Sequence, residues 1–122
     1  MNKAGLPEVD KMSGEDFEIF LEQLFRNQGY KVERVGRRAE YGGDLLIELA
    51  GIRTAVQAKR CSNPVNVKAI QEIYTAKVHY AATEAMVVTN SRFTSNARTL
   101  EKENHVQLVD REKLASLILQ KQ

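Results

Sequence analysis

The sequence predicts a three-layer α/β domain with a mixed central sheet. Three observations support this prediction: the apolar patterns follow the order αβββαβαβα, a short turn links two of the strands, and a helix links two others. A short turn joins antiparallel neighbours, whereas a strand–helix–strand connection joins parallel strands through a right-handed crossover. A sheet that contains both kinds of neighbour and is covered by helices forms such a domain.

Length and composition indicate one globular domain. The chain has 122 residues, 28% of them charged and 43% hydrophobic, which is ordinary usage for a single compact core. The formal net charge of +2 permits a polyanionic partner without requiring one. Residues 1–11 contain a lone proline and little pattern, so we expect an N-terminal arm before a domain over residues 12–122.

Cysteine usage and hydropathy bear on the compartment. Cys61 is the single cysteine of the sequence, which excludes an internal disulfide framework and favours a reducing compartment. No stretch approaches the roughly 20 apolar residues of a membrane span. We therefore expect a cytoplasmic protein.

The first helix and strand are predicted from the spacing of apolar residues and from residues that begin and end helices. Residues 12–27 place large apolar side chains at helical intervals, with Ser13 as N-cap, Asp16 in the capping-box position and Gly29 as the stop. Residues 30–35 then alternate imperfectly, as in a half-buried strand.

A strand pair is predicted next. Residues 44–49 form an apolar run after a glycine pair, Ala50 and Gly51 form a turn, and residues 53–59 alternate as a third strand. The remaining elements are a crossover helix over residues 67–82, a buried strand over 85–89, a helix over 94–103, a strand over 106–109, and a last helix from the N-cap Asp110 to Leu119.

Three polar residues of this strand pair are candidates for chemistry. Gln57 and Lys59 share one face of their strand, and the turn brings Asp44 beside them. Hydrolysis of a phosphodiester needs a neutralised phosphate and a nucleophilic water, and a divalent cation held by oxygen ligands serves both needs. Asp44, the Gln57 amide and the Ala58 carbonyl would be ligands, while Lys59 would polarise the water and stabilise charge on the phosphate.

The spacing of Asp44 and Lys59 alone also fits a cross-strand ion pair. A carboxylate beside a lysine on adjacent strands more often forms such a pair than a functional site. Asp44 stands at the head of three apolar residues. A charge in that position is costly without a partner or a metal, and this favours the functional interpretation.

The chain resembles a known family along almost its whole length, from about Met12 to Leu119. The segments that carry the resemblance are, in order, FEIFLEQLFRNQGYKV, YGGDLLIEL, VQAKR, VKAIQEIYTA, AMVVTN with RFTSNA, and VQLVDREKLA. They resemble the Mrr-like restriction endonuclease domain of the PD-(D/E)XK nuclease superfamily. The resemblance implies the restriction-endonuclease-like fold, an αβββαβ core with a mixed sheet and a C-terminal helical extension.

The resemblance also implies a role for particular residues. The metal-binding aspartate of the family corresponds to Asp44, and its QxK variant motif corresponds to Gln57 and Lys59. Its helix-borne glutamate corresponds to Glu18, although Glu22 lies one helical turn further along and both are also explained as solvated helix acids. Most members of the superfamily have a third acidic residue where this sequence has Gln57. The replacement lowers the negative charge of the set of metal ligands.

The activity implied is that of a Mg²⁺-dependent DNA endonuclease, with Mn²⁺ as a substitute, acting on foreign or modified DNA as type IV restriction enzymes do. Similar nucleases commonly dimerise, so we expect a homodimer, and similar proteins can carry a membrane helix. Two alternatives remain open: a non-catalytic DNA-binding module of the same fold, and a junction resolvase. Residues expected to contact DNA phosphates are Arg34, Arg37, Arg38, Arg60 and Gln71.

Overall fold

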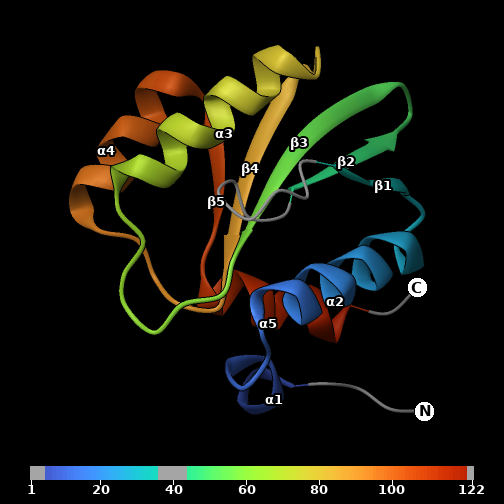
Figure 1. Cartoon of the computed structure of the whole chain (residues 1–122), viewed down its shortest axis with the longest axis vertical. Coiled ribbons are helices and arrows are strands. Elements are labelled where there is room, and N and C mark those ends of the chain that lie inside the picture. The colour runs from blue at the N-terminus through green and yellow to red at the C-terminus, as the bar shows by residue number, and fades with distance from the viewer. Residues whose placement is uncertain (1–4, 36–43, 121–122) are drawn as a thin grey trace.

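The computed structural model describes residues 5–35 and 44–120 and has the predicted three-layer architecture (Figure 1). Its five strands form one sheet in the order β1-β2-β3-β4-β5, in which β1, β2 and β3 are antiparallel neighbours and β3, β4 and β5 are parallel. The strands are β1 (Lys31–Val35), β2 (Asp44–Leu49), β3 (Ile52–Lys59), β4 (Glu84–Thr89) and β5 (Val106–Val109). The helices are α1 (Leu6–Asp10), α2 (Gly14–Asn27), α3 (Val67–His79), α4 (Ser95–Asn104) and α5 (Arg111–Leu119).

Helices cover both faces of this sheet. On one face, Leu46 and Ala55 of the sheet pack with Ile70 and Ile73 of α3 and with Ala97 of α4. The other core consists of buried residues from α1, α2, α5 and the opposite face of the strands, namely Val9, Phe17, Leu21, Phe25, Val32, Leu45, Ile47, Val56, Met86, Val88, Val109 and Leu114. Because successive strand residues point to opposite faces, the continuous apolar runs of β2 and β4 supply both cores.

Polar side chains determine where the helices begin. The Ser13 hydroxyl accepts a hydrogen bond from the Asp16 N–H at 3.0 Å, and the Asp110 carboxylate accepts one from the Lys113 N–H at 3.1 Å, so both predicted N-caps are confirmed. Gly29 adopts a φ of 99° directly after the C-cap of α2. This left-handed conformation suits glycine and ends the helix.

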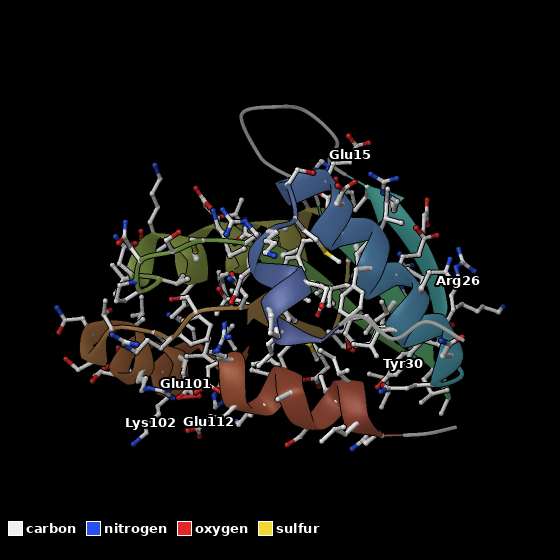
Figure 2. The ribbon with its side chains drawn as sticks, turned by 90° about the horizontal axis from the view of Figure 1, so that it is seen from below. Glu15, Arg26, Tyr30, Glu101, Lys102 and Glu112 are labelled. Carbon is white, nitrogen blue, oxygen red and sulfur yellow. The ribbon has the colours of Figure 1, made fainter. Side chains whose placement is uncertain are left out.

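Residues 6–10, which carry too little pattern for a prediction from sequence, form the short helix α1. Its start is stabilised by the Glu8 carboxylate, which accepts a hydrogen bond from the Gly5 N–H at 3.0 Å. Val9 is fully buried in the core beneath α2. Seen from below, α1 lies in front of the sheet with α2 and α5, and Glu15 and Arg26 mark opposite ends of α2 (Figure 2).

The turn between β2 and β3 has two residues, Ala50 and Gly51, with φ values of 55° and 81°. Two consecutive positive φ values define a type I′ hairpin turn, which favours asparagine followed by glycine. In the left-handed region the Cβ of either residue crowds the following carbonyl, but the short polar side chain of asparagine offsets part of that cost by hydrogen-bonding locally, which alanine cannot do.

We predict that Ala50→Asn raises the free energy of unfolding by about 0.5–1 kcal/mol, measured by urea denaturation. Gly51→Ala, which introduces a Cβ at the other positive φ, is the matched comparison and should be destabilising. A loss of stability in Ala50→Asn would contradict this assignment of the turn.

Candidate active site

The predicted site residues of the strands meet where β2 begins and β3 ends. Asp44, the first residue of β2, is paired in the backbone ladder with Gln57, and Lys59 is the last residue of β3. On the other side of β3, Lys59 is paired with Thr89 of β4, and Ala58 with Val88. The sheet therefore brings the backbones of Asp44 and of the Gln57–Lys59 segment to one place.

Gln57 is almost completely enclosed, with 4% of its surface exposed. Its Nε2 donates a hydrogen bond to Oε1 of Glu72 at 3.2 Å, while its own Oε1 is buried and has no hydrogen-bond partner among the described residues. A buried carbonyl oxygen without a partner costs about 1–3 kcal/mol. Such a cost at one atom is typical of a functional site.

Lys59 contacts the same carboxylate. Its Nζ lies 3.5 Å from Oε1 of Glu72, and both side chains are 37% exposed. Both QxK side chains of β3 thus lie against a helix-borne carboxylate on the face of the sheet covered by α3. The sequence assigns no role to Glu72, because a glutamate within an amphipathic helix has no distinguishing pattern. The available signal is its place beside Gln71 in the segment VKAIQEIYTA, which matches the crossover helix of the family.

Glu18 and Arg34 form an ion pair on the other face of the sheet. Glu18 of α2 is 7% exposed, and its Oε1 accepts a hydrogen bond from Nη2 of Arg34 at 3.2 Å. Arg34 also lies 3.6 Å from the exposed Glu15. Because α2 packs on the face opposite to α3, Glu18 contacts Arg34, whereas Gln57 and Lys59 contact Glu72.

Glu22, the alternative to Glu18, is engaged within its own helix. Its Oε2 accepts hydrogen bonds from Nε and Nη2 of Arg26 at 3.2 and 2.9 Å. The same arginine donates to the Val32 carbonyl at 2.8 Å. Both glutamates are thus joined to β1 through an arginine, Glu18 to the Arg34 side chain and Glu22 through Arg26 to the Val32 carbonyl. Glu18 is the more enclosed of the two.

The expected phosphate-contacting residues lie in different places. Arg60 follows β3 directly and donates to the Asp10 carbonyl at 3.1 Å, and Gln71 is exposed on α3. Arg37 and Arg38 lie outside the described residues. Arg34 takes part in the ion pair with Glu18 described above.

A polar network joins the carboxyl ends of the parallel strands. Asp10 of α1 accepts hydrogen bonds from Asn90 at 2.9 Å and from two nitrogens of Arg111 at 2.8 and 3.0 Å. Asn90, which is buried, accepts a hydrogen bond from the Cys61 N–H at 2.8 Å. The hydrogen bonds from Arg111, followed by that from Asn90, hold the pKa of Asp10 below its usual value. The network positions the chain just beyond Lys59.

This network borders a hollow of about 720 Å³ at the same end of the sheet. Four arginines contribute to its lining, together with three acidic residues: Arg60, Arg92, Arg98, Arg111, Asp10, Asp110 and Glu112. Within the side chains that the structure describes, no group of three histidine, cysteine or carboxylate residues is arranged to hold a metal ion.

The arrangement of the sheet and its flanking helices defines the restriction-endonuclease-like fold of the PD-(D/E)XK nucleases. One solved structure with this fold is the DNA modification-dependent restriction endonuclease AspBHI, with a TM-score of 0.72 and 20% sequence identity; the match covers 93% of this chain and 34% of that chain. Another is the MspJI restriction endonuclease in complex with a 27-mer oligonucleotide, with a TM-score of 0.64 and 18% identity; the match covers 92% of this chain and 30% of that chain.

Sequence comparison identifies the family. The model of the Mrr catalytic domain, described as a restriction endonuclease, matches residues 9–118, so the chain belongs to the Mrr-like restriction endonuclease family. The type IV methyl-directed restriction enzyme EcoKMrr of Escherichia coli (strain K12) is 30% identical in an alignment of 119 positions that covers 90% of this chain. The chain spans 39% of the length of that relative.

No helix within residues 5–35 and 44–120 combines the length and the apolar character needed to traverse a lipid bilayer.

We predict that Asp10→Asn lowers the free energy of unfolding at pH 7 by about 1 kcal/mol, because the charge-assisted bonds to Arg111 are weakened. Since the pKa of Asp10 is lowered in the folded state, its contribution is present above the unfolded pKa and is lost as the pH falls through the folded pKa. The difference between the two proteins should therefore shrink below about pH 4.

Urea denaturation at pH 7 and pH 3 measures the difference in free energy of unfolding between the wild type and Asp10→Asn. The control is Glu103→Gln, which changes an exposed acid on α4. If Asp10→Asn lowered the free energy of unfolding equally at both pH values, the charge of the Asp10 carboxylate would not be what stabilises the network.

Proposed function

We propose that this chain is the catalytic domain of a metal-dependent DNA endonuclease that hydrolyses phosphodiester bonds in foreign or modified DNA. The observation that carries the proposal is the register of β2 and β3, which pairs Asp44 with Gln57 two residues before Lys59. Membership of the Mrr-like family supports the same chemistry. The names of AspBHI and EcoKMrr, one modification-dependent and one methyl-directed, support modified DNA as the substrate class.

The residues at this place fit a divalent cation. The buried Oε1 of Gln57, which has no partner among the described residues, is a hard neutral donor of the kind that Mg²⁺ and Mn²⁺ accept. Asp44 would add an anionic oxygen, and the Ala58 carbonyl, between the two QxK side chains, a third. Glu18 is proposed as a further ligand from α2. Mg²⁺ bound there would supply charge neutralisation of the phosphate and acidification of water.

The role of the protein residues follows from their charge and position. Lys59, partly exposed at the end of β3, would hold the attacking water and stabilise negative charge on the phosphate. Arg60 and Arg34, with Arg37, Arg38 and Gln71, are proposed to contact the DNA backbone, which fixes the position of the duplex without reading its sequence. Because cleavage of both strands needs two such sites, we propose that the active form is a homodimer.

A specific observation favours a second candidate, a non-catalytic DNA-binding module. Gln57 supplies no charge, and Lys59 is paired with Glu72. A set of metal ligands with little negative charge binds a cation weakly. A lysine that is paired with a glutamate is also less available to bind a phosphate. A junction resolvase differs in the DNA structure that it cuts, and a four-way junction compared with linear duplex at equal salt distinguishes it.

We predict that Asp44→Ala and Lys59→Ala each reduce cleavage of supercoiled plasmid at least about 100-fold, because each removes electrostatic stabilisation at the phosphate. The assay compares methylated and unmethylated plasmid with Mg²⁺ or Mn²⁺, and Lys102→Ala, an exposed lysine of α4, is the control. Wild-type protein that binds DNA but neither Mn²⁺ nor Mg²⁺ would favour the non-catalytic module.

We predict that Arg60→Gln weakens DNA binding and lowers the slope of log Kd against log salt by about 1, because one phosphate contact is lost. Fluorescence anisotropy with labelled duplex over a range of salt concentrations measures the slope. Thermal unfolding is followed in parallel, since Arg60 also donates to the Asp10 carbonyl. Weaker binding with an unchanged slope would exclude a direct phosphate contact.

A further inference from the structure

Glu72 of α3 lies against both side chains of the QxK motif. Its Oε1 accepts the hydrogen bond from Gln57 Nε2 at 3.2 Å and lies 3.5 Å from Nζ of Lys59. Gln57 and Lys59 are two residues apart on β3 and therefore share a face of the sheet. One carboxylate oxygen thus contacts the two strand residues on which the proposed function depends.

The contact with Glu72 decides which end of the Gln57 amide points away from the helix. An amide has a donor end and an acceptor end, whereas an ionised carboxylate only accepts hydrogen bonds. The reverse orientation would place the Gln57 oxygen 3.2 Å from a carboxylate oxygen, where the two repel each other. The carboxylate therefore selects the orientation that leaves Oε1, the only cation-binding atom of this side chain, without a partner among the described residues.

The position of Glu72 is set by the packing of its helix. Ile70 and Ile73 on α3 are fully buried against the sheet, and the Asn66 side chain caps the start of the helix by accepting from the Lys68 N–H at 3.0 Å. Glu72 lies between these anchors and remains partly exposed, while its neighbour Gln71 is exposed. The same packing that closes one core thus holds the carboxylate at the end of β3.

The pairing also explains a glutamine in place of an acid. A carboxylate at position 57, 4% exposed and as close to Glu72 as the amide is, would place two negative charges together in a poorly solvated region. The neutral amide removes this repulsion and adds a hydrogen bond. The negative charge that the motif lacks on β3 is present instead on the neighbouring helix.

We propose that Glu72 is a positioning residue of the metal site: it holds the Gln57 amide with Oε1 directed to a divalent cation and it holds Lys59 beside that cation. This inference rests on the proposed function and adds to it a residue from the crossover helix. A surface ion pair between Lys59 and Glu72 without such a role would contribute to stability alone.

The experiment compares Mn²⁺ binding by isothermal titration calorimetry in the wild-type chain, Glu72→Gln, Glu72→Asp, Asp44→Ala and a control, Thr75→Ala. Thr75 is an exposed residue of the same helix. Glu72→Gln keeps the shape of the side chain but donates as readily as it accepts, so it no longer selects one amide orientation. We expect its Mn²⁺ affinity to fall about tenfold, the lower end of the loss seen when a partner of a metal ligand is removed. Glu72→Asp should recover part of the affinity, and Thr75→Ala should bind as the wild type does.

A second readout needs no metal. In the wild-type chain, the side-chain NH₂ resonances of Gln57, assigned by their loss in Gln57→Ala, should exchange slowly with solvent, and Glu72→Gln should speed this exchange. Thermal unfolding of each variant separates both effects from loss of the fold.

The outcomes separate the two proposals. If Glu72→Gln binds Mn²⁺ as tightly as wild type while Asp44→Ala does not, the positioning role is overturned and the proposed function stands. If the folded wild-type chain binds no Mn²⁺, the metal-dependent function fails and the role of Glu72 in it fails as well. Tenfold weaker Mn²⁺ binding in Glu72→Gln, with unchanged binding in Thr75→Ala, supports both proposals.

Discussion

The pairing of β3 with both of its neighbours is the constraint on which the site depends. The two-residue turn at Ala50 and Gly51 makes Leu49 and Ile52 opposite partners, and from there the antiparallel register runs to Asp44 and Gln57. A slip of one residue would move every side chain of β3 to the other face. Gln57 would then enter the core beneath α2, and Val56 would take its place beside α3.

The apolar cores make such a slip costly. Ala55 contributes to the core under α3, and Val56 to the core under α2. Burying a polar amide in the second core without a partner would cost a few kcal/mol. The hydrophobic packing of the central strand thus holds the polar end of the same strand in register, and the proposed chemistry lies beside the buried part of the sheet.

The other side of β3 is held by parallel pairing and by the network around Asp10. Lys59 is paired with Thr89, whose hydroxyl donates to the Lys59 carbonyl at 2.6 Å. Asn90 binds the Cys61 N–H, and Asp10 binds Asn90 and Arg111. The short helix α1 therefore belongs to the structure that surrounds the end of β3, although residues 1–11 have little pattern in the sequence.

Local patterns were sufficient to predict the order of the elements from α2 to α5, the mixed sheet and the caps at Ser13 and Asp110, because periodicity and turn chemistry act over a few residues. They also predicted that Asp44, Gln57 and Lys59 converge, since a two-residue turn fixes the register of its strands. Only the tertiary structure decided that Glu72 contacts Gln57 and Lys59, that Glu18 pairs with Arg34, and that α1 joins the network at the strand ends. These contacts depend on how helices distant in sequence pack on each face of the sheet, and side-chain spacing within a helix carries no information about that packing.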